Sequence, residues 1–378
     1  MLILVRNPVP KLRSCFKKAR LLSAGARLCA RFGFEEIALS LVERALDEEP
    51  HRVELHLQAG ELSFKLGLMD RAVEHVRYLW PGSRAERGVF DFEAGPLRGA
   101  APAFFKERAW ILAAIGGHLL GAREPGRALS YINRAIAAGL THSSVLNLKG
   151  LCLLQLGQTE EALKAFQDAR TAGGRSAGLL VNMGIALNRL GRYAEALRCY
   201  EEAQRLGAGG VELFNNKGFS LFFLRRYDEA TACFELAQAM EPQDTVRANL
   251  ALCYFKTGRV GRAIQLLKEL VEKNPEDPVL LNNLALCLEA AEKRHEALAL
   301  YKKAAAIGGP ERNTFLVNQA ACLAGMGRFE EAQKIIERLE EIAPQDERVW
   351  SLKASIMAEL GREGEAVACY RRALGLTG

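Results

Sequence analysis

The sequence predicts an all-α solenoid built from repeated helical hairpins. Two observations carry this prediction: the sequence is self-similar at a period near 34 residues, and each period holds two apolar stripes of helical spacing. Ala, Leu, Glu, Arg and Gly dominate, while strand-favouring runs of Val, Ile, Thr and Tyr are scarce. At 378 residues the chain also exceeds what one globular core usually supports. A repeat array accommodates such a length.

The repeat has a short signature: a small residue, an aromatic or aliphatic residue four later, and Ala three beyond that. It is clearest at Ala196, Tyr200 and Ala203. The first residue of the signature recurs at Ala38, Ala72, Ala128, Ala162, Ala196, Ala230, Ala263, Ala297, Ala332 and Ala366. Eight of the nine intervals lie between 33 and 35 residues, so the pattern predicts ten repeats.

Each repeat is expected to hold two helices joined by a glycine turn. A small residue stands twelve positions before the signature Ala: Ala26, Gly60, Gly116, Gly150, Gly184, Gly218, Ala251, Ala285, Ala320 and Ala354. Glycine stands five positions before it at Gly33, Gly67, Gly157, Gly191, Gly258, Gly327 and Gly361. The small residues allow the two helices to approach closely, and the glycines end the first helix. A single hairpin cannot bury both apolar stripes, so neighbouring hairpins must stack.

These residues resemble the tetratricopeptide repeat family over residues 19–378, apart from one insertion. The resemblance implies a right-handed superhelical α-solenoid of helix–turn–helix repeats. It also implies a concave surface, lined mainly by the first helix of each pair, where members of the family bind their ligands. We expect repeats 1–2 at residues 19–86 and repeats 3–10 at residues 109–378.

One interval is 22 residues too long, which places an insertion at residues 87–108. It is rich in Gly and Pro, and the region also holds Phe90, Phe92, Phe104 and Phe105. Two interpretations stand: a surface excursion whose phenylalanines pack back onto the second and third repeats, or a loop that binds a partner.

The basic character of the chain is concentrated at its N-terminus. Residues 1–31 hold eight basic side chains and no acidic one, whereas the whole chain has a formal charge of only +6. We assign residues 1–18 to a basic segment that leads into an amphipathic helix, with Leu12, Phe16, Ala19, Leu22 and Ala26 on one side. This helix is expected to cap the first repeat. The alternative is docking to an anionic membrane surface or to nucleic acid.

Nothing in the sequence predicts catalysis, a cofactor or a metal site. The six histidines are scattered, and the HExxH and GxxxxGK[ST] motifs do not occur. Seven of the nine cysteines occupy two recurring places, Cys152, Cys253, Cys287 and Cys322 in first helices and Cys199, Cys233 and Cys369 in second helices. We therefore interpret them as small core residues. Free thiols, a short opening apolar run and no stretch of 18 apolar residues favour a cytoplasmic protein.

The candidate site is a row of asparagines two positions before the recurring small residue. We name it the asparagine row: Asn182, Asn216, Asn249, Asn283 and Asn318. Asn is a mediocre helix residue, so five in register in consecutive repeats require an explanation. A carboxamide offers two donors and an acceptor, so a row of them can hold the N–H and C=O groups of an extended chain independently of its sequence.

Further residues are expected to face the same groove: Asn147, Asn215, Asn282, Phe219, Phe222, Phe223, Leu252 and Phe255. The row is similar to that of peptide-binding superhelices of the family, notably the repeat domain of O-linked N-acetylglucosamine transferases and the kinesin light chains. That resemblance implies a peptide site at the asparagine row with Asn215, Asn282, Phe219, Phe223 and Phe255. The alternative is that the asparagines hydrogen-bond within the scaffold and tie one repeat to the next.

The predicted function is a scaffold or adaptor that binds an extended segment of a partner protein in the concave groove. One alternative is a self-assembling scaffold, a homo-oligomer that stacks through a last repeat without a polar capping helix. Another is a peripheral membrane organiser that uses the basic N-terminal segment.

Overall fold

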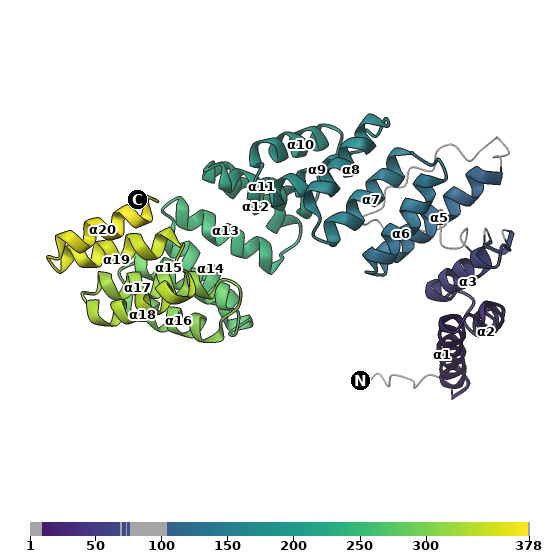
Figure 1. Cartoon of the computed structure of the whole chain (residues 1–378), viewed down its shortest axis with the longest axis horizontal. Coiled ribbons are helices and arrows are strands. Elements are labelled where there is room, and N and C mark those ends of the chain that lie inside the picture. The colour runs from purple at the N-terminus through teal and green to yellow at the C-terminus, as the bar shows by residue number, and fades with distance from the viewer. Residues whose placement is uncertain (1–9, 69, 73, 76–103, 377–378) are drawn as a thin grey trace, which may run out of the picture. The chain divides into compact units, whose positions relative to one another are not determined.

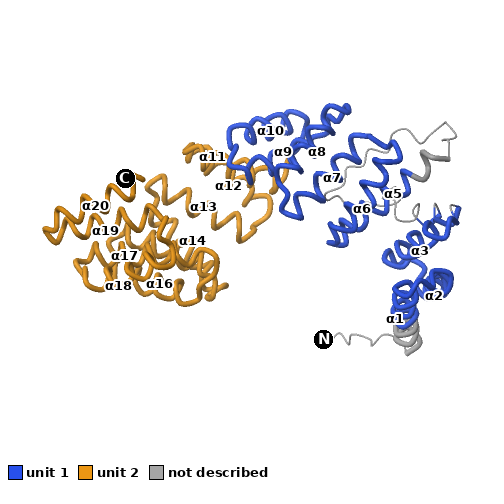
Figure 2. The backbone as a smooth tube through the Cα atoms, in the orientation of Figure 1, with its two compact units in different colours: residues 1–208 blue, residues 209–378 orange. Residues whose placement is uncertain are grey.

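The computed structural model describes residues 10–68, 70–72, 74–75 and 104–376, and every regular element in these ranges is an α-helix (Figure 1). The chain divides into two compact units, residues 1–208 and 209–378 (Figure 2). Each unit is a succession of antiparallel helical hairpins, which confirms the predicted solenoid of helix–turn–helix repeats.

The first unit contains the helices of repeats 1–5. Its helices are α1 (Pro10–Arg31), α2 (Glu35–Glu48), α3 (Val53–Lys65), α5 (Phe104–Gly121), α6 (Pro125–Ala137), α7 (Ser143–Gln155), α8 (Thr159–Thr171), α9 (Ala177–Arg189) and α10 (Tyr193–Arg205). The second unit contains repeats 6–10. Its helices are α11 (Val211–Phe223), α12 (Tyr227–Met240), α13 (Asp244–Lys256), α14 (Val260–Lys273), α15 (Pro278–Ala290), α16 (Arg294–Ile307), α17 (Arg312–Gly325), α18 (Phe329–Ile342), α19 (Glu347–Glu359) and α20 (Glu363–Ala373).

The recurring small residue sets the distance between the two helices of a hairpin. A Cβ atom placed on Gly184 of α9 would lie 2.4 Å from the ring of Tyr200 of α10, and one on Gly150 would lie 2.3 Å from the ring of Phe166. Both rings are fully buried. Glycine therefore makes room for a large aromatic residue on the paired helix, because packed interiors have no spare volume for a methyl group.

The turn between the two helices has a left-handed residue five positions before the signature Ala. At the seven predicted glycines, Gly191 among them, φ lies between 71° and 81°. Repeats 3, 6 and 8 lack this glycine, yet Arg123, Arg225 and Glu292 adopt φ values of 60–61° at the same place. The packing of the hairpin thus imposes the turn even where the residue type disfavours it.

Consecutive hairpins are joined by burial of apolar side chains. In the second unit, Leu267 and Leu270 of α14 pack in one cluster with Leu280, Leu284 and Leu288 of the next first helix, α15. A second helix is therefore covered on one side by its own partner and on the other by the following first helix, as stacking requires.

Two observed helices extend across segment boundaries expected from the sequence. α1 begins at Pro10 and continues past residue 18, where the basic segment was expected to end. Ala19, Leu22 and Ala26 lie in the core cluster of the first repeats, on the side that the amphipathic pattern predicts. α5 begins at Phe104, inside the expected insertion at 87–108. Residues 87–103, including Phe90 and Phe92, and the side chains of residues 10–18 and 104–108 lie outside what the structure describes.

Candidate functional site

Several first helices of consecutive repeats contact one another, and the asparagine row lies on first helices. Contacts join α7 to α9, α11 to α13, α13 to α15 and α17 to α19. All five residues of the asparagine row are half-buried on first helices. They are Asn182 on α9, Asn216 on α11, Asn249 on α13, Asn283 on α15 and Asn318 on α17.

Three members of the row form a carboxamide clasp with the preceding repeat. The Nδ2 group of Asn182 donates to Oδ1 of Asn147 at 3.0 Å. Asn249 donates in the same way to Asn215 at 3.1 Å. The third bond joins Asn318 to Asn282 at 2.8 Å.

In each clasp the donor stands two positions before the small residue of its repeat, and the acceptor stands three positions before that of the preceding repeat. The accepting asparagines thus have a defined role that the sequence pattern alone did not assign.

The clasps occur at alternate junctions between repeats. For Asn283 the accepting place in the preceding repeat holds Ala248, which has no carboxamide. A related bond joins the first two repeats, where Ser23 Oγ donates to Gln58 Oε1 at 3.2 Å. Ser23 and Gln58 occupy the two clasp places, and comparing residues three positions before the small residue would have revealed them.

The clasp does not exhaust the hydrogen-bonding capacity of the two amides. It uses one N–H of the donor and one lone pair of the acceptor, and a carboxamide has two N–H groups and an oxygen with two lone pairs. Each pair therefore keeps donors and acceptors for a further group. Asn282 is the most enclosed of the six, with 6% of its surface exposed, whereas its partner Asn318 is half-buried.

An aromatic cluster lies at the C-terminal end of α11 in the second unit. The ring centroids of Phe219 and Phe223 are 4.8 Å apart, and Phe222 lies edge-on to both Phe223 and Tyr227. Phe223 exposes 47% of its surface, while Phe219 and Phe222 are half-buried. The structure thus brings Phe219 and Phe223 together at a surface that can receive an apolar side chain.

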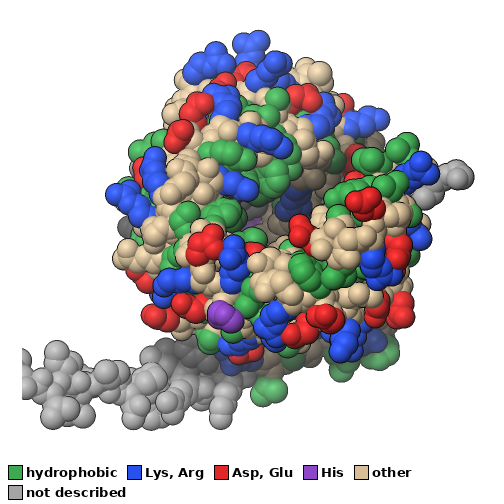
Figure 3. Space-filling view, turned by 90° about the vertical axis from the view of Figure 1, so that its left-hand side faces the viewer, with side chains coloured by type: hydrophobic (Ala, Val, Ile, Leu, Met, Phe, Trp, Pro, Cys, Tyr) green, Lys and Arg blue, Asp and Glu red, His purple; other side chains and the backbone are tan. Residues whose placement is uncertain are grey.

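Phe255 of α13 is also half-buried, and it packs partly on the core cluster of the second unit. The ammonium group of Lys256 lies 5.5 Å from the centre of its ring. Leu252 is half-buried on the same helix. Figure 3 is viewed from the end that carries α15–α20 and shows hydrophobic side chains beside charged ones on the surface.

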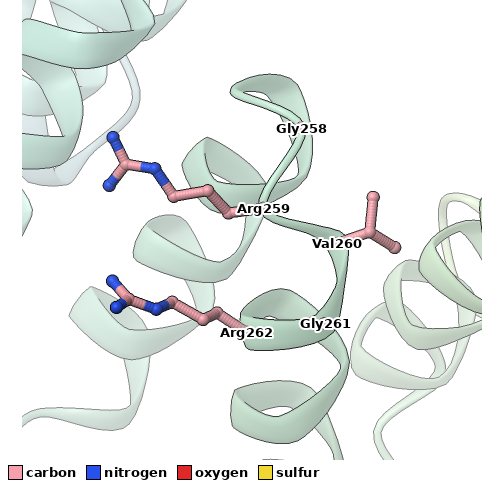
Figure 4. Close-up of a pocket in the computed structure, with 5 residues that line it drawn as sticks. All are labelled: Gly258, Arg259, Val260, Gly261 and Arg262. Atoms are coloured by element: carbon pink, nitrogen blue, oxygen red, sulfur yellow. The ribbon is translucent and has the colours of Figure 1, made fainter.

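A shallow pocket lies at the turn between α13 and α14, lined by residues 258–262. Figure 4 shows Arg259 and Arg262 extending to one side of this turn and Val260 to the other. Both guanidinium carbons lie 5.8 Å from the ring centre of Tyr254. Arg259 also pairs with Asp228 at 3.7 Å.

Repeat 7 differs from its neighbours at this turn. In five other repeats the equivalent basic residue pairs with a glutamate three positions later, as Arg192 does with Glu195 at 2.7 Å. In repeat 7 the residue three positions after Arg259 is Arg262. At this turn a second arginine therefore replaces the glutamate partner, and the sequence shows this exchange once the repeats are aligned.

The seven cysteines at the two recurring places lie in the core, as interpreted from their register. Cys152, Cys253, Cys287 and Cys322 have 0% exposure, and the three in second helices have 8%. Burial raises the pKa of Cys152 to about 12, because the thiolate loses its hydration in the core. Within the described ranges, no group of three or more His, Cys, Asp or Glu side chains is placed to hold a metal ion. No helix in the same ranges is long and apolar enough to cross a membrane.

Sequence comparisons agree with this architecture. Family models described as tetratricopeptide repeat match residues 114–178, 154–211, 181–245, 288–356 and 347–378. The model described as anaphase-promoting complex, cyclosome, subunit 3 matches residues 224–304. No curated protein matches the chain in sequence.

Solved structures are similar to the chain at low sequence identity and with TM-scores below 0.5. PilW, a type IV pilus biogenesis factor, is 20% identical with a TM-score of 0.49, covering 55% of this chain and 96% of its own. Yeast Tom70 is 15% identical with a TM-score of 0.47, covering 96% of this chain and 85% of its own. PilF of Pseudomonas aeruginosa is 20% identical with a TM-score of 0.46, covering 56% and 97%.

The hairpins, their register and the matches to tetratricopeptide repeat models define a helical-repeat scaffold of the kind that mediates protein–protein contacts. The chain belongs to the tetratricopeptide repeat family.

Proposed function

We propose that the chain is an adaptor that binds an extended peptide segment of a partner protein along the layer of first helices. The asparagine row is the binding element. Asn182, Asn216, Asn249, Asn283 and Asn318, with Asn215 and Asn282, contact the backbone of the peptide, and Phe219, Phe223 and Phe255 contact its side chains.

The single observation that carries the proposal is the carboxamide clasp. A clasp fixes the orientation of both amides, because each is held by a partner on the neighbouring helix at 2.8–3.1 Å. A donor held in place before the ligand arrives loses less conformational entropy on binding. Bracing of the scaffold and contact with a ligand are therefore compatible roles for the same pair.

The spacing of the row suits a peptide backbone rather than a specific sequence. Consecutive members are 33–35 residues apart, so each repeat presents one carboxamide from an equivalent place. Backbone contacts give affinity without sequence preference, and apolar surfaces beside them select side chains. The exposed ring of Phe223 is the strongest candidate for such a surface in this chain.

A peptide display library selected on the full-length chain supplies the probe for a test. The affinity of the selected peptides is then measured by fluorescence anisotropy for the wild type, Asn249→Ala and Asn283→Ala. Each substitution should weaken binding about tenfold, since removing one hydrogen bond to a ligand costs about 1–1.5 kcal/mol. Asn274→Ala is the matched control, because Asn274 is exposed at a turn between repeats.

Unchanged affinity in both row variants, with circular dichroism equal to the wild type, refutes the proposed site. A cytoplasmic location forms part of the proposal and rests on the buried free thiols, which a reducing compartment preserves.

A further inference from the structure

The first and the last described helices each expose an apolar stripe. On α1 the stripe consists of Leu21, Leu28 and Phe32, with 74%, 58% and 68% of their surfaces exposed; we call it the head face. On α20 it consists of Val367, Tyr370 and Leu374, with 53%, 43% and 72% exposed; we call it the tail face. Spacings of three, four and seven residues place each set on one side of its helix.

The register of the repeats shows what normally covers the head face. Leu21 stands five positions before the small residue Ala26, and the equivalent residues of the other nine repeats are Leu55, Ile111, Val145, Leu179, Leu213, Val246, Leu280, Phe315 and Val349. Their exposed fractions lie between 0 and 8%. Phe315 is covered by Ala304 and Ala305, both on the second helix of the preceding repeat, α16. Leu21 thus occupies a place built to receive a second helix.

The tail face shows the reciprocal feature. Tyr370 stands four positions after the signature Ala, and the equivalent residues that the structure describes are Val42, Ile132, Phe166, Tyr200, Phe234, Leu267, Tyr301 and Ile336. Their exposed fractions are 0 or 1%. Ile336 lies in one cluster with Val349 and Ile356 of α19, the first helix of the following repeat. The place of Tyr370 is therefore built to be covered by a first helix.

Among the described residues, no second helix covers the head face and no first helix covers the outer side of the tail face, so each face offers the kind of helix that the other would receive. We propose that the chain assembles head to tail, with the head face of one copy covering the tail face of the next. The junction then repeats the packing seen between repeats within each unit, such as α16 with α17. The contact is heterologous, since two different surfaces meet. It involves one face from each unit and leaves the asparagine row outside the contact.

Two blocked variants test the proposal. Leu21→Glu places a charge on the head face, and Val367→Glu places one on the tail face. Both residues are more than half exposed, so neither change burdens the fold of the monomer. A carboxylate enclosed in the contact should weaken assembly about tenfold or more. Leu236→Glu is the matched control, because Leu236 is 49% exposed on an inner helix, α12.

Sedimentation velocity and light scattering report the mass of each sample as concentration increases. We expect the wild type and Leu236→Glu to grow beyond the monomer mass of 41.6 kDa. Each blocked variant alone should remain monomeric, whereas a mixture of the two should form dimers, because each retains the face that the other has lost.

Two results overturn the proposal. A wild type that remains monomeric at the highest concentration shows that the two faces do not bind each other. Self-association belongs to another surface if either blocked variant alone assembles as strongly as the wild type. The same conclusion holds if the mixture of the two variants stays monomeric while the wild type assembles. Circular dichroism of all four proteins confirms that the comparison is between folded chains.

Discussion

The carboxamide clasp between Asn318 and Asn282 predicts a measurable coupling between the two residues. Asn318 donates to Asn282 at 2.8 Å, and Asn282 is 6% exposed. Asn318→Ala leaves the buried oxygen of Asn282 without this donor, which should cost about 1–3 kcal/mol of stability. Replacing both residues by alanine removes the unpaired group as well. The double variant should therefore lose less than the sum of the two single losses, with a coupling of about 0.5–1.5 kcal/mol.

Urea denaturation followed by circular dichroism gives the free energies for this cycle. A repeat array can unfold in parts, so hydrogen exchange with mass spectrometry should confirm that the change is localised to α15 and α17. Asn283→Ala is the internal reference, because Asn283 faces Ala248 rather than a carboxamide in the preceding repeat. Additive losses in the cycle, with no coupling beyond error, refute the clasp as a stabilising contact between repeats.

Three further predictions follow from the packing, the turns and the buried thiols. Gly184→Ala places a methyl group 2.4 Å from the ring of Tyr200 and should destabilise the protein by about 1–3 kcal/mol. Gly178→Ala on the same helix meets no atom within 4 Å and should stabilise the protein by up to about 0.5–1 kcal/mol. Equal urea midpoints for the two variants contradict this prediction. Arg225→Gly relieves a φ of 61° and should raise stability by about 0.5–1 kcal/mol, while Gly191→Ala at the equivalent turn should lower it by about 1 kcal/mol; thermal melts decide the signs. Burial raises the pKa of the Cys152 thiol from 9.0 to about 12, so the contribution of this thiol to stability is complete below pH 9 and declines as the pH rises toward 12. If a Cys152→Ser variant loses stability at alkaline pH as the wild type does, other groups cause the decline.

The repeat period predicts the fold because the same packing positions recur in every hairpin. The sequence shows the pairing of a small residue with a large one, as for Gly184 and Tyr200. It also shows the buried apolar stripe of a helix, as for Ala38 and Val42. The turn is harder to predict where Arg225 replaces glycine, since only the packing of the hairpin accounts for its left-handed conformation. Similarly, the amphipathic pattern of α1 gives its buried side but not its first residue, because a helix end depends on local capping rather than on period.

The sequence predicts the positions of the asparagines in the repeats but not their hydrogen-bond partners. The register places five asparagines in equivalent positions, yet it does not reveal that Asn147, Asn215 and Asn282 accept hydrogen bonds from the following repeat. That pairing depends on how far one hairpin is rotated against the next, which no single repeat encodes. The bond between Ser23 and Gln58 lies outside the row because neither residue is an asparagine, although the two residues occupy the clasp places.

The central claim is that the asparagine row holds the backbone of an extended peptide. The most direct measurement compares a library-selected peptide with versions N-methylated at single backbone positions, each titrated against the wild type and Asn249→Ala. Methylation at the amide that contacts Asn249 should weaken binding to the wild type about tenfold and leave binding to the variant unchanged, because both changes remove the same hydrogen bond. If every methylated peptide binds both proteins as well as the parent does, the carboxamides do not hold the backbone and the claim fails.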